Sequence, residues 1–106
     1  MAGRRKDRST DNVLADLGFR DAEELTAKAI LAKKINDIVE SRGITQSYAA
    51  KLLGIAQPKI SAIRNYKLRG ISLERLMQAL TSLGQHVEIV VSPCGRDTPA
   101  RIVVAA

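Results

Sequence analysis

The sequence predicts a mainly α-helical domain, a bundle of four to five helices followed by a short C-terminal β-strand or hairpin. Apolar residues recur at helical spacing through the middle of the chain, and only three of 106 residues are aromatic, which favours an aliphatic helical core. From residue 85 the apolar spacing changes from helical to alternating. We therefore divide the chain into a flexible N-terminal segment (1–20), a helical domain (21–84) and C-terminal strands (85–106).

Positive charge is concentrated in the centre of the chain. The formal net charge is +6, and residues 41–73 contain six Lys or Arg residues and no acidic residue. In the rest of the chain, positive and negative residues are equal in number. Duplex DNA is a dense line of phosphates, so a folded helix pair holding all the surplus positive charge is typical of a DNA-reading element.

Several other classes of protein do not fit this sequence. No apolar run approaches the roughly 20 residues of a membrane span, and the N-terminal residues lack the apolar stretch of a signal peptide. Cys94 is the single cysteine and His86 the single histidine, so we expect a free thiol and no metal site. The sequence has no Gly-rich phosphate loop and no convincing carboxylate pair. We expect a cytoplasmic protein that is not an enzyme, uses no cofactor and does not bind membranes.

The N-terminal part contains two different segments. Residues 1–12 are polar and charged, and we interpret them as disordered. The apolar island at 13–19 has the spacing of one or two helical turns, which Gly18 is expected to end.

A longer helix is expected next. Asp21 and Glu24 form a variant of the capping box, which predicts a helix over residues 22–41. Its apolar residues lie at helical spacing, and Lys28, Lys33, Lys34, Asp37 and Glu40 are expected on its other faces. Gly43 follows the helix, and Arg42 suits its negative C-terminal end.

Two short helices joined by a glycine turn are predicted at the centre of the basic region. Thr45 caps a helix that ends at residue 53, because its hydroxyl can accept a free backbone N–H. Gly54 then turns the chain, and a second helix covers residues 57–65. Pro58 is tolerated there because the first helical turn has no internal N–H bonds to lose.

These two helices meet the packing requirements of a helix-turn-helix. Where the helices cross, the first needs a small residue, and Ala50 is expected there. Gly54 follows four residues later and supplies the turn. The shared core needs branched apolar side chains, and the candidates are Leu52, Leu53, Ile55, Ile60 and Ile63.

A fourth helix and two strands complete the expected fold. Ser72 caps a helix over residues 72–83, with Glu74 near its positive end, and Gly84 stops it. Strands are predicted at 85–91 and 100–105. A lone hairpin is marginal in water, so we expect two copies of the chain to pair through Val87, Ile89 and Val91. Two-fold symmetry would place two DNA-reading helices about 34 Å apart, matching a palindromic operator.

Residues 45–65 resemble the Xre/Cro-type helix-turn-helix regulators, whose pattern is T-Q-x-x-x-A-x-x-L-G-I-x-Q-x-x-[IV]-S-x-[IL]. The narrower pattern G-I-x-Q-P-K-[IV]-S at 54–61, with S-L-x-R-L-x-x-A-L-x-x-L-G-x-x-V-E-I at 72–89, looks like HigA-type antitoxins. The element N-V-x-A-D-L-G-F at 12–19 resembles the same group. The resemblance implies a lambda-repressor-like bundle, a repressor of its own operon, and a small basic ribonuclease toxin encoded beside it.

Two residues depart from the family pattern. Ala56 replaces a Ser often found before Gln57, so the following helix loses a side-chain cap worth about 1 kcal/mol. Tyr48 stands where many relatives have Glu, which breaks the capping box with Thr45. Tyr48 faces either the DNA backbone or the core.

The expected DNA contacts lie on and around the third helix. In this fold that helix lies in the major groove with its first residues against base edges. A Gln amide can bond adenine at two points, Lys can reach guanine, and Ala can touch a thymine methyl. The resemblance implies that Gln46 contacts a phosphate and braces Gln57, and loop cations hold flanking phosphates. The predicted DNA-binding residues are Gln46, Gln57, Pro58, Lys59, Ser61, Ala62, Arg64, Asn65, Lys67 and Arg69.

The sequence leaves two functional hypotheses open. The apolar island of Val13, Leu14, Leu17 and Phe19 either folds on a toxin or packs on the protein's own first helix. The first case predicts an antitoxin that also represses its operon. The second is compatible with a stand-alone Xre-family regulator that has no toxin partner.

Overall fold

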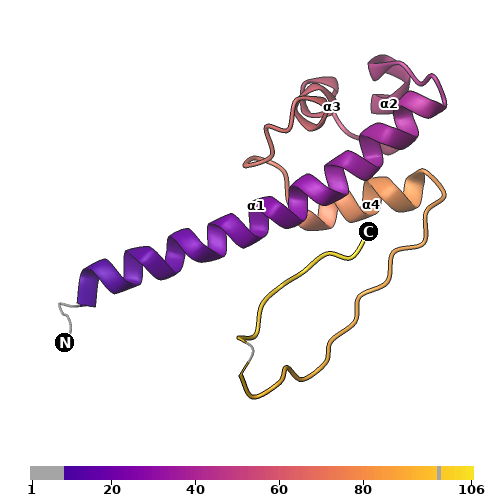
Figure 1. Cartoon of the computed structure of the whole chain (residues 1–106). Coiled ribbons are helices and arrows are strands. Elements are labelled where there is room, and N and C mark those ends of the chain that lie inside the picture. The colour runs from indigo at the N-terminus through magenta and orange to yellow at the C-terminus, as the bar shows by residue number, and fades with distance from the viewer. Residues whose placement is uncertain (1–8, 98) are drawn as a thin grey trace.

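Four helices build the described part of the chain. The computed structural model describes residues 9–97 and 99–106, which contain α1 (Ser9–Ser41), α2 (Gln46–Leu53), α3 (Gln57–Arg64) and α4 (Leu73–Ser82). α1 packs along α4, and α2 packs against α3. Figure 1 shows the three shorter helices gathered around the C-terminal half of α1, while its N-terminal part extends beyond them. The predicted mainly helical bundle is confirmed.

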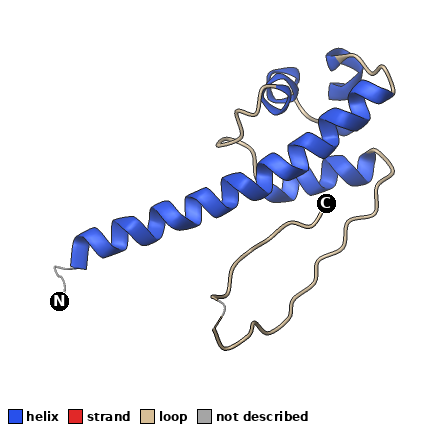
Figure 2. Cartoon of the chain, in the orientation of Figure 1, coloured by secondary structure: helices blue, strands red, loops and turns tan. Residues whose placement is uncertain are grey.

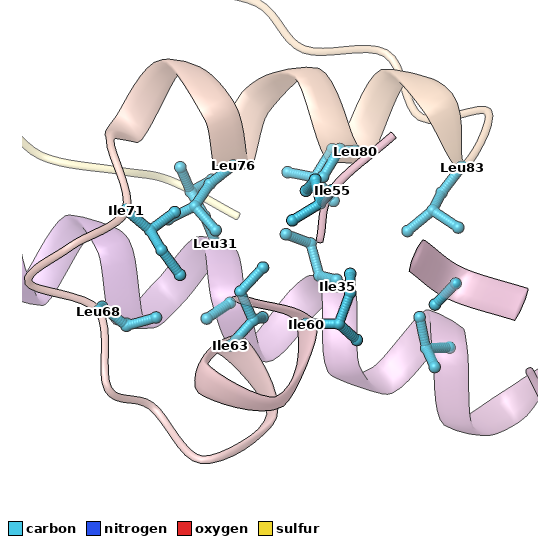
Figure 3. Packing of buried hydrophobic residues seen from close by; sticks show 14 residues of the cluster. Leu31, Ile35, Ile55, Ile60, Ile63, Leu68, Ile71, Leu76, Leu80 and Leu83 are labelled. Carbon is cyan, nitrogen blue, oxygen red and sulfur yellow. The ribbon is translucent and has the colours of Figure 1, made fainter. Parts of the chain in front are cut away.

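The core is aliphatic and is shared by all four helices. Its largest fully buried side chains are Ile63, Leu76 and Leu83. Figure 3 shows side chains of α4 pointing toward those of α1 and α3, with Leu76 beside Leu31. Fully burying one such side chain stabilises the fold by about 1.5–3 kcal/mol. The core therefore fixes α3 through one apolar face and leaves its other face free.

The local signals around α2 and α3 are confirmed. The Thr45 hydroxyl accepts a hydrogen bond from the Tyr48 backbone N–H at 3.1 Å, which caps α2. Gly54 ends α2 in the left-handed region with φ +65°. Pro58 lies in the first turn of α3, which begins without a side-chain cap at Ala56. The Ser72 hydroxyl likewise caps α4 by accepting from the Arg75 N–H.

We expect Gly54→Ala to lower the free energy of unfolding by about 1–2 kcal/mol, the cost of a left-handed residue that carries a Cβ. No atom lies within 4 Å of a Cβ built at Gly54, so the backbone conformation alone causes the loss. Gly70 is the matched control, because it has the same open space without a positive φ. Gly70→Ala should change the stability by less than about 0.5 kcal/mol. Urea denaturation followed by circular dichroism compares the two, and equal losses would contradict this account.

Two residues of α2 occupy positions that differ from those expected. Ala49 is the fully buried small residue of this helix, whereas Ala50 is only partly buried. Leu52, expected in the shared core, is 38% exposed. The helical phase explains both differences, since one helix face can enter the core and that face carries Ala49 and Leu53.

The expected N-terminal break is wrong. α1 runs without interruption from Ser9 to Ser41, so Gly18 does not end a helix and Asp21 does not begin one. Residues 9–12, expected to be disordered, belong to this helix, and residues 1–8 lie outside the described residues. An internal glycine costs a helix only about 1 kcal/mol relative to alanine, and helix-favouring neighbours can offset that cost.

Two basic residues, one in α1 and one just after it, lie in places that differ from those expected. Lys28 was expected on an outer face, but its side chain is 4% exposed and lies within the core-facing stripe. Arg42 was expected to serve the end of its own helix. Its Nη2 instead donates a hydrogen bond at 2.9 Å to the carbonyl of Leu83, the C-cap residue of α4.

The predicted C-terminal strands are also wrong for the described residues. The chain after α4 forms an extended loop that leaves the helices and returns toward them (Figure 2). Val87 and Val104 pack partly on the core at its two ends. Between these anchors Ile89, Val90 and Val91 are exposed. Alternating apolar residues form a strand only when another strand supplies hydrogen bonds, and one copy of the chain does not supply them here.

Candidate nucleic-acid interface

The first turn of α3 presents polar side chains to solvent. Gln57, Pro58 and Lys59 are exposed, whereas Ile60 and Ile63 on the opposite face are buried. This arrangement follows from helical periodicity, because one apolar stripe is enough to anchor a helix. Of the residues expected on the exposed face of α3, Gln57 and Lys59 are exposed. Their contact with DNA stays a prediction.

The remaining predicted residues of α3 are more deeply placed or already hydrogen-bonded. Ser61 and Ala62 are half-buried, while Arg64 and Asn65 are exposed. The Asn65 amide donates to the Ser61 carbonyl at 2.9 Å, so it is used within the last turn of the helix. The outer surface available to a ligand is therefore concentrated in the first turn and at Arg64.

Lys59 has a partner in the absence of DNA. Its Nζ donates to the Gly70 carbonyl at 3.0 Å, which links α3 to the loop before α4. Within the described part of the chain, the neighbouring Gln57 amide makes no hydrogen bond. Lys59 must release or share the Gly70 carbonyl to reach a base, whereas Gln57 is free to do so.

Gln46 lies beside α3 but does not bond to Gln57. It is half-buried in the first turn of α2, and with Arg64 it lines a small cavity of about 10 Å³ between α1, α2 and α3. No hydrogen bond joins Gln46 to Gln57 in the structure of the described residues. The brace that the family resemblance implies is thus not formed in this state of the molecule.

The loop after α3 begins with a Schellman motif, a turn that closes a helix C-terminus. The Lys67 N–H donates to the Ala62 carbonyl at 2.8 Å, and the Tyr66 N–H donates to the Ile63 carbonyl at 3.2 Å. Tyr66 takes the left-handed position with φ +58°, where glycine is usual. Tyr66 and Leu25 of α1 both line an open groove beside this loop.

This loop has both buried and exposed residues. Leu68 and Ile71 are buried and anchor the loop, while Lys67 and Arg69 are exposed. The two cations are therefore held next to α3 on a loop whose backbone is fixed by packing. This is the placement that phosphate contacts flanking a major groove require.

One acidic side chain from α1 reaches this surface. Asp21 Oδ2 accepts a hydrogen bond from Arg69 Nη1 at 2.8 Å, and both side chains are largely exposed. No local pattern indicates this pair, because the two residues are 48 positions apart. Arg69 is thus partly neutralised in the free protein, and a phosphate would compete with Asp21 for it.

We expect Asp21→Asn to strengthen binding to duplex DNA of any sequence several-fold, because it removes a competing carboxylate from Arg69. The free energy of unfolding should change by less than about 1 kcal/mol, as is usual for an exposed ion pair. Fluorescence anisotropy with a labelled duplex measures the affinity. Asp37→Asn, which removes another exposed carboxylate of α1, paired with Lys33, is the control. Equal gains for both variants would mean that only the net charge matters.

Some of the residues that support this surface lie on α1 and carry no DNA-binding signal in the sequence. Lys28 Nζ donates to the Leu68 carbonyl, and Asn36 Nδ2 donates to the Ile63 carbonyl. The spacing of Lys28 from Leu31, Ala32 and Ile35 could have indicated its buried position. Nothing local could have indicated its partner, which is 40 residues away.

Two other features, a membrane-spanning helix and a metal site, are not found among the described residues. None of their helices is both long and apolar enough to cross a membrane. Within the same part of the chain, His, Cys, Asp and Glu side chains form no group that could hold a metal ion.

The chain is similar to known proteins in both sequence and structure. The family described as "Helix-turn-helix domain" matches residues 13–92. A solved structure named "Putative XRE Family Transcriptional Regulator" is 49% identical in sequence and superposes with a TM-score of 0.74. That alignment covers 81% of this chain and 98% of the other. No curated protein matches the sequence.

Proposed function

Because the chain belongs to the helix-turn-helix domain family and is an Xre-type transcriptional regulator, we propose that it represses transcription as a homodimer bound to a palindromic operator. The observation that carries this proposal is the exposed polar first turn of α3 beside a loop with two exposed cations. Gln57 and Lys59 read base edges, and Ser61 and Ala62 lie against the same groove. Gln46, Arg64, Lys67 and Arg69 hold the flanking phosphates. This activity places the protein in the cytoplasm with the DNA.

The first experiment measures binding to duplexes of about 20 base pairs, long enough for two half-sites. One duplex has an arbitrary sequence, and a second is selected from a randomised library by the protein itself. The logarithm of the affinity should fall linearly with the logarithm of salt concentration. Lys67→Ala should weaken binding to both duplexes and lower the salt slope by about one, whereas Lys59→Ala should mainly relax base choice. Binding that does not depend on salt would contradict the proposal.

The dimer is supported by the exposed apolar segment after α4. Ile89 is 72% exposed and Val91 is 92% exposed, an unfavourable state for side chains at the middle of an extended segment. A second copy that packs on this segment would cover them, and Val87 continues the same row into the core. Sedimentation at micromolar concentration tests the idea, with and without the selected duplex. A monomer under both conditions would contradict it.

An additional antitoxin role is favoured by the shape of α1. Its N-terminal part extends beyond the other helices (Figure 1), and it carries Val13, Leu14, Leu17 and Phe19. We expect these residues to bind a small basic ribonuclease toxin. Deleting residues 1–20 should then spare DNA binding and abolish neutralisation of a toxin encoded beside the gene. If no such neighbour exists, the protein is a stand-alone regulator.

A further inference from the structure

Lys28 is a buried cation that bonds to the DNA-facing loop. Its side chain is 4% exposed, and its Nζ lies 3.1 Å from the Leu68 carbonyl and 3.0 Å from Glu24 Oε2. Burying a charge is costly unless it is paired and hydrogen-bonded. Glu24 is on the same helix, so the ion pair does not depend on the loop. The hydrogen bond to the Leu68 carbonyl lasts only while the loop keeps its position, so the buried charge opposes displacement of Leu68.

Asn36 makes a similar bond two turns further along α1. Its Nδ2 donates to the Ile63 carbonyl at 3.1 Å. Ile63 lies in the last turn of α3, and its carbonyl also accepts the Tyr66 N–H at 3.2 Å. The Asn36 amide therefore adds a side-chain bond from α1 to the turn that closes α3. α1 therefore holds both the end of α3 and the loop that follows it.

We propose that Lys28 and Asn36 are positioning residues for DNA binding, acting through the backbone of α3 and its loop. Leu68 stands between Lys67 and Arg69, the two exposed cations of the loop. A fixed Leu68 carbonyl also fixes the backbone positions from which the Lys67 and Arg69 side chains extend. A binding constellation works only when its groups are held to about 0.5 Å and 10–20° by supporting contacts.

The inference rests on the proposed DNA contacts, and it assigns two different effects to the two residues. Lys28 acts on the loop, so it governs phosphate contacts and the electrostatic part of binding. Asn36 acts on the end of α3, so it governs the angle of the helix that reads bases. A residue that only stabilised the fold would change neither quantity once the protein is folded.

The first test compares Lys28→Met with Lys33→Met. Lys33 is on the same helix and is paired with Asp37 at 2.9 Å, but its contact is exposed and local. Each variant loses one positive charge and one pair with a carboxylate four residues away. Affinity is measured with the arbitrary-sequence duplex of about 20 base pairs, and circular dichroism gives the folded fraction.

Lys28→Met should weaken duplex binding about tenfold at 0.1 M salt and lower the salt slope by about one, the contribution of one phosphate contact. Backbone amides of the loop at 67–71 should also exchange hydrogen faster. Lys33→Met should leave both quantities near their wild-type values. Equal affinity and slope for the two folded variants would overturn the inference.

The second test remains informative if Lys28→Met does not fold. Asn36→Ala removes only one side chain from a half-buried helical position, where alanine is favourable for the helix. It should lower the ratio of affinities for the library-selected and arbitrary duplexes about fivefold. Gln78→Ala, which removes an exposed amide from α4, should leave this ratio unchanged. An unchanged ratio for folded Asn36→Ala would overturn the inference for Asn36.

Failure of the proposed function has a different signature. In that case the wild-type protein itself would bind neither duplex in a salt-dependent way. If the wild type binds and the Lys28 and Asn36 variants behave as their controls, DNA binding stands and the positioning role is wrong.

Discussion

Replacing Ile63 by alanine is expected to lower the free energy of unfolding by about 2–5 kcal/mol. Ile63 is 2% exposed and packs where α1, α3 and α4 meet, so its removal leaves a cavity that the neighbouring helices can fill only partly. Small domains are stable by only about 5–15 kcal/mol in total. The variant should therefore unfold at much lower urea concentration, as measured by circular dichroism.

Ile102 provides the matched control for this prediction. It is the same residue type but is 67% exposed in the extended C-terminal loop. Ile102→Ala should change the stability by less than about 0.5 kcal/mol. If the two variants lost similar stability, the apolar centre of the protein would not be the one described above.

Replacing Gln57 by alanine is expected to weaken binding to the library-selected duplex by about 1–3 kcal/mol, the usual discrimination of a two-point amide–adenine contact. Gln57 is exposed in the first turn of α3 and is uncharged. Binding to an arbitrary duplex and the salt slope should stay almost unchanged, since an uncharged side chain releases no counterions. Anisotropy titrations with both duplexes measure the difference.

Gln78→Ala controls for the loss of an exposed amide elsewhere on the surface. It should affect neither duplex. Equal weakening of both duplexes by Gln57→Ala would show that Gln57 contacts the DNA backbone and not a base edge. In that case Lys59 would be the remaining candidate for base reading in the first turn of α3.

The structure separates Gln57 from Lys59 more clearly than the sequence does. The two residues are equally good candidates by position and residue type, and both are exposed. Lys59 Nζ, however, already bonds to the Gly70 carbonyl, so its contact with a base competes with a bond inside the protein. This competition makes Gln57 the stronger test of base recognition.

The supporting side of the interface depends on α1, a helix that does not carry the DNA-reading residues. Lys28, Asn36 and Asp21 contact the end of α3 or its loop over separations of 27 to 48 residues. Lys28 and Asn36 donate hydrogen bonds to the backbone carbonyls of Leu68 and Ile63. Asp21 forms an ion pair with Arg69. α1 thus both fixes the basic loop and lowers its positive potential.

The helix-turn-helix can be recognised from the sequence alone, because its signals are local. The Thr45 cap, the left-handed Gly54 turn, the position of Pro58 and the buried face of α3 follow from short-range backbone and side-chain preferences. Those preferences act over a few residues and can be recognised without the rest of the chain.

The course of α1 and of the C-terminal segment becomes clear only in the folded protein. The unbroken course of α1 through Gly18 reflects a balance in which one weak position is tolerated by its neighbours. The burial of Lys28 depends on a carbonyl 40 residues away, and the expected strands at 85–91 and 100–105 need pairing partners that one copy does not supply. The balance at Gly18 is local but too close to be decided by propensity alone. The partner of Lys28 and the pairing of the C-terminal segment are set by contacts between distant residues, which short-range sequence patterns do not identify.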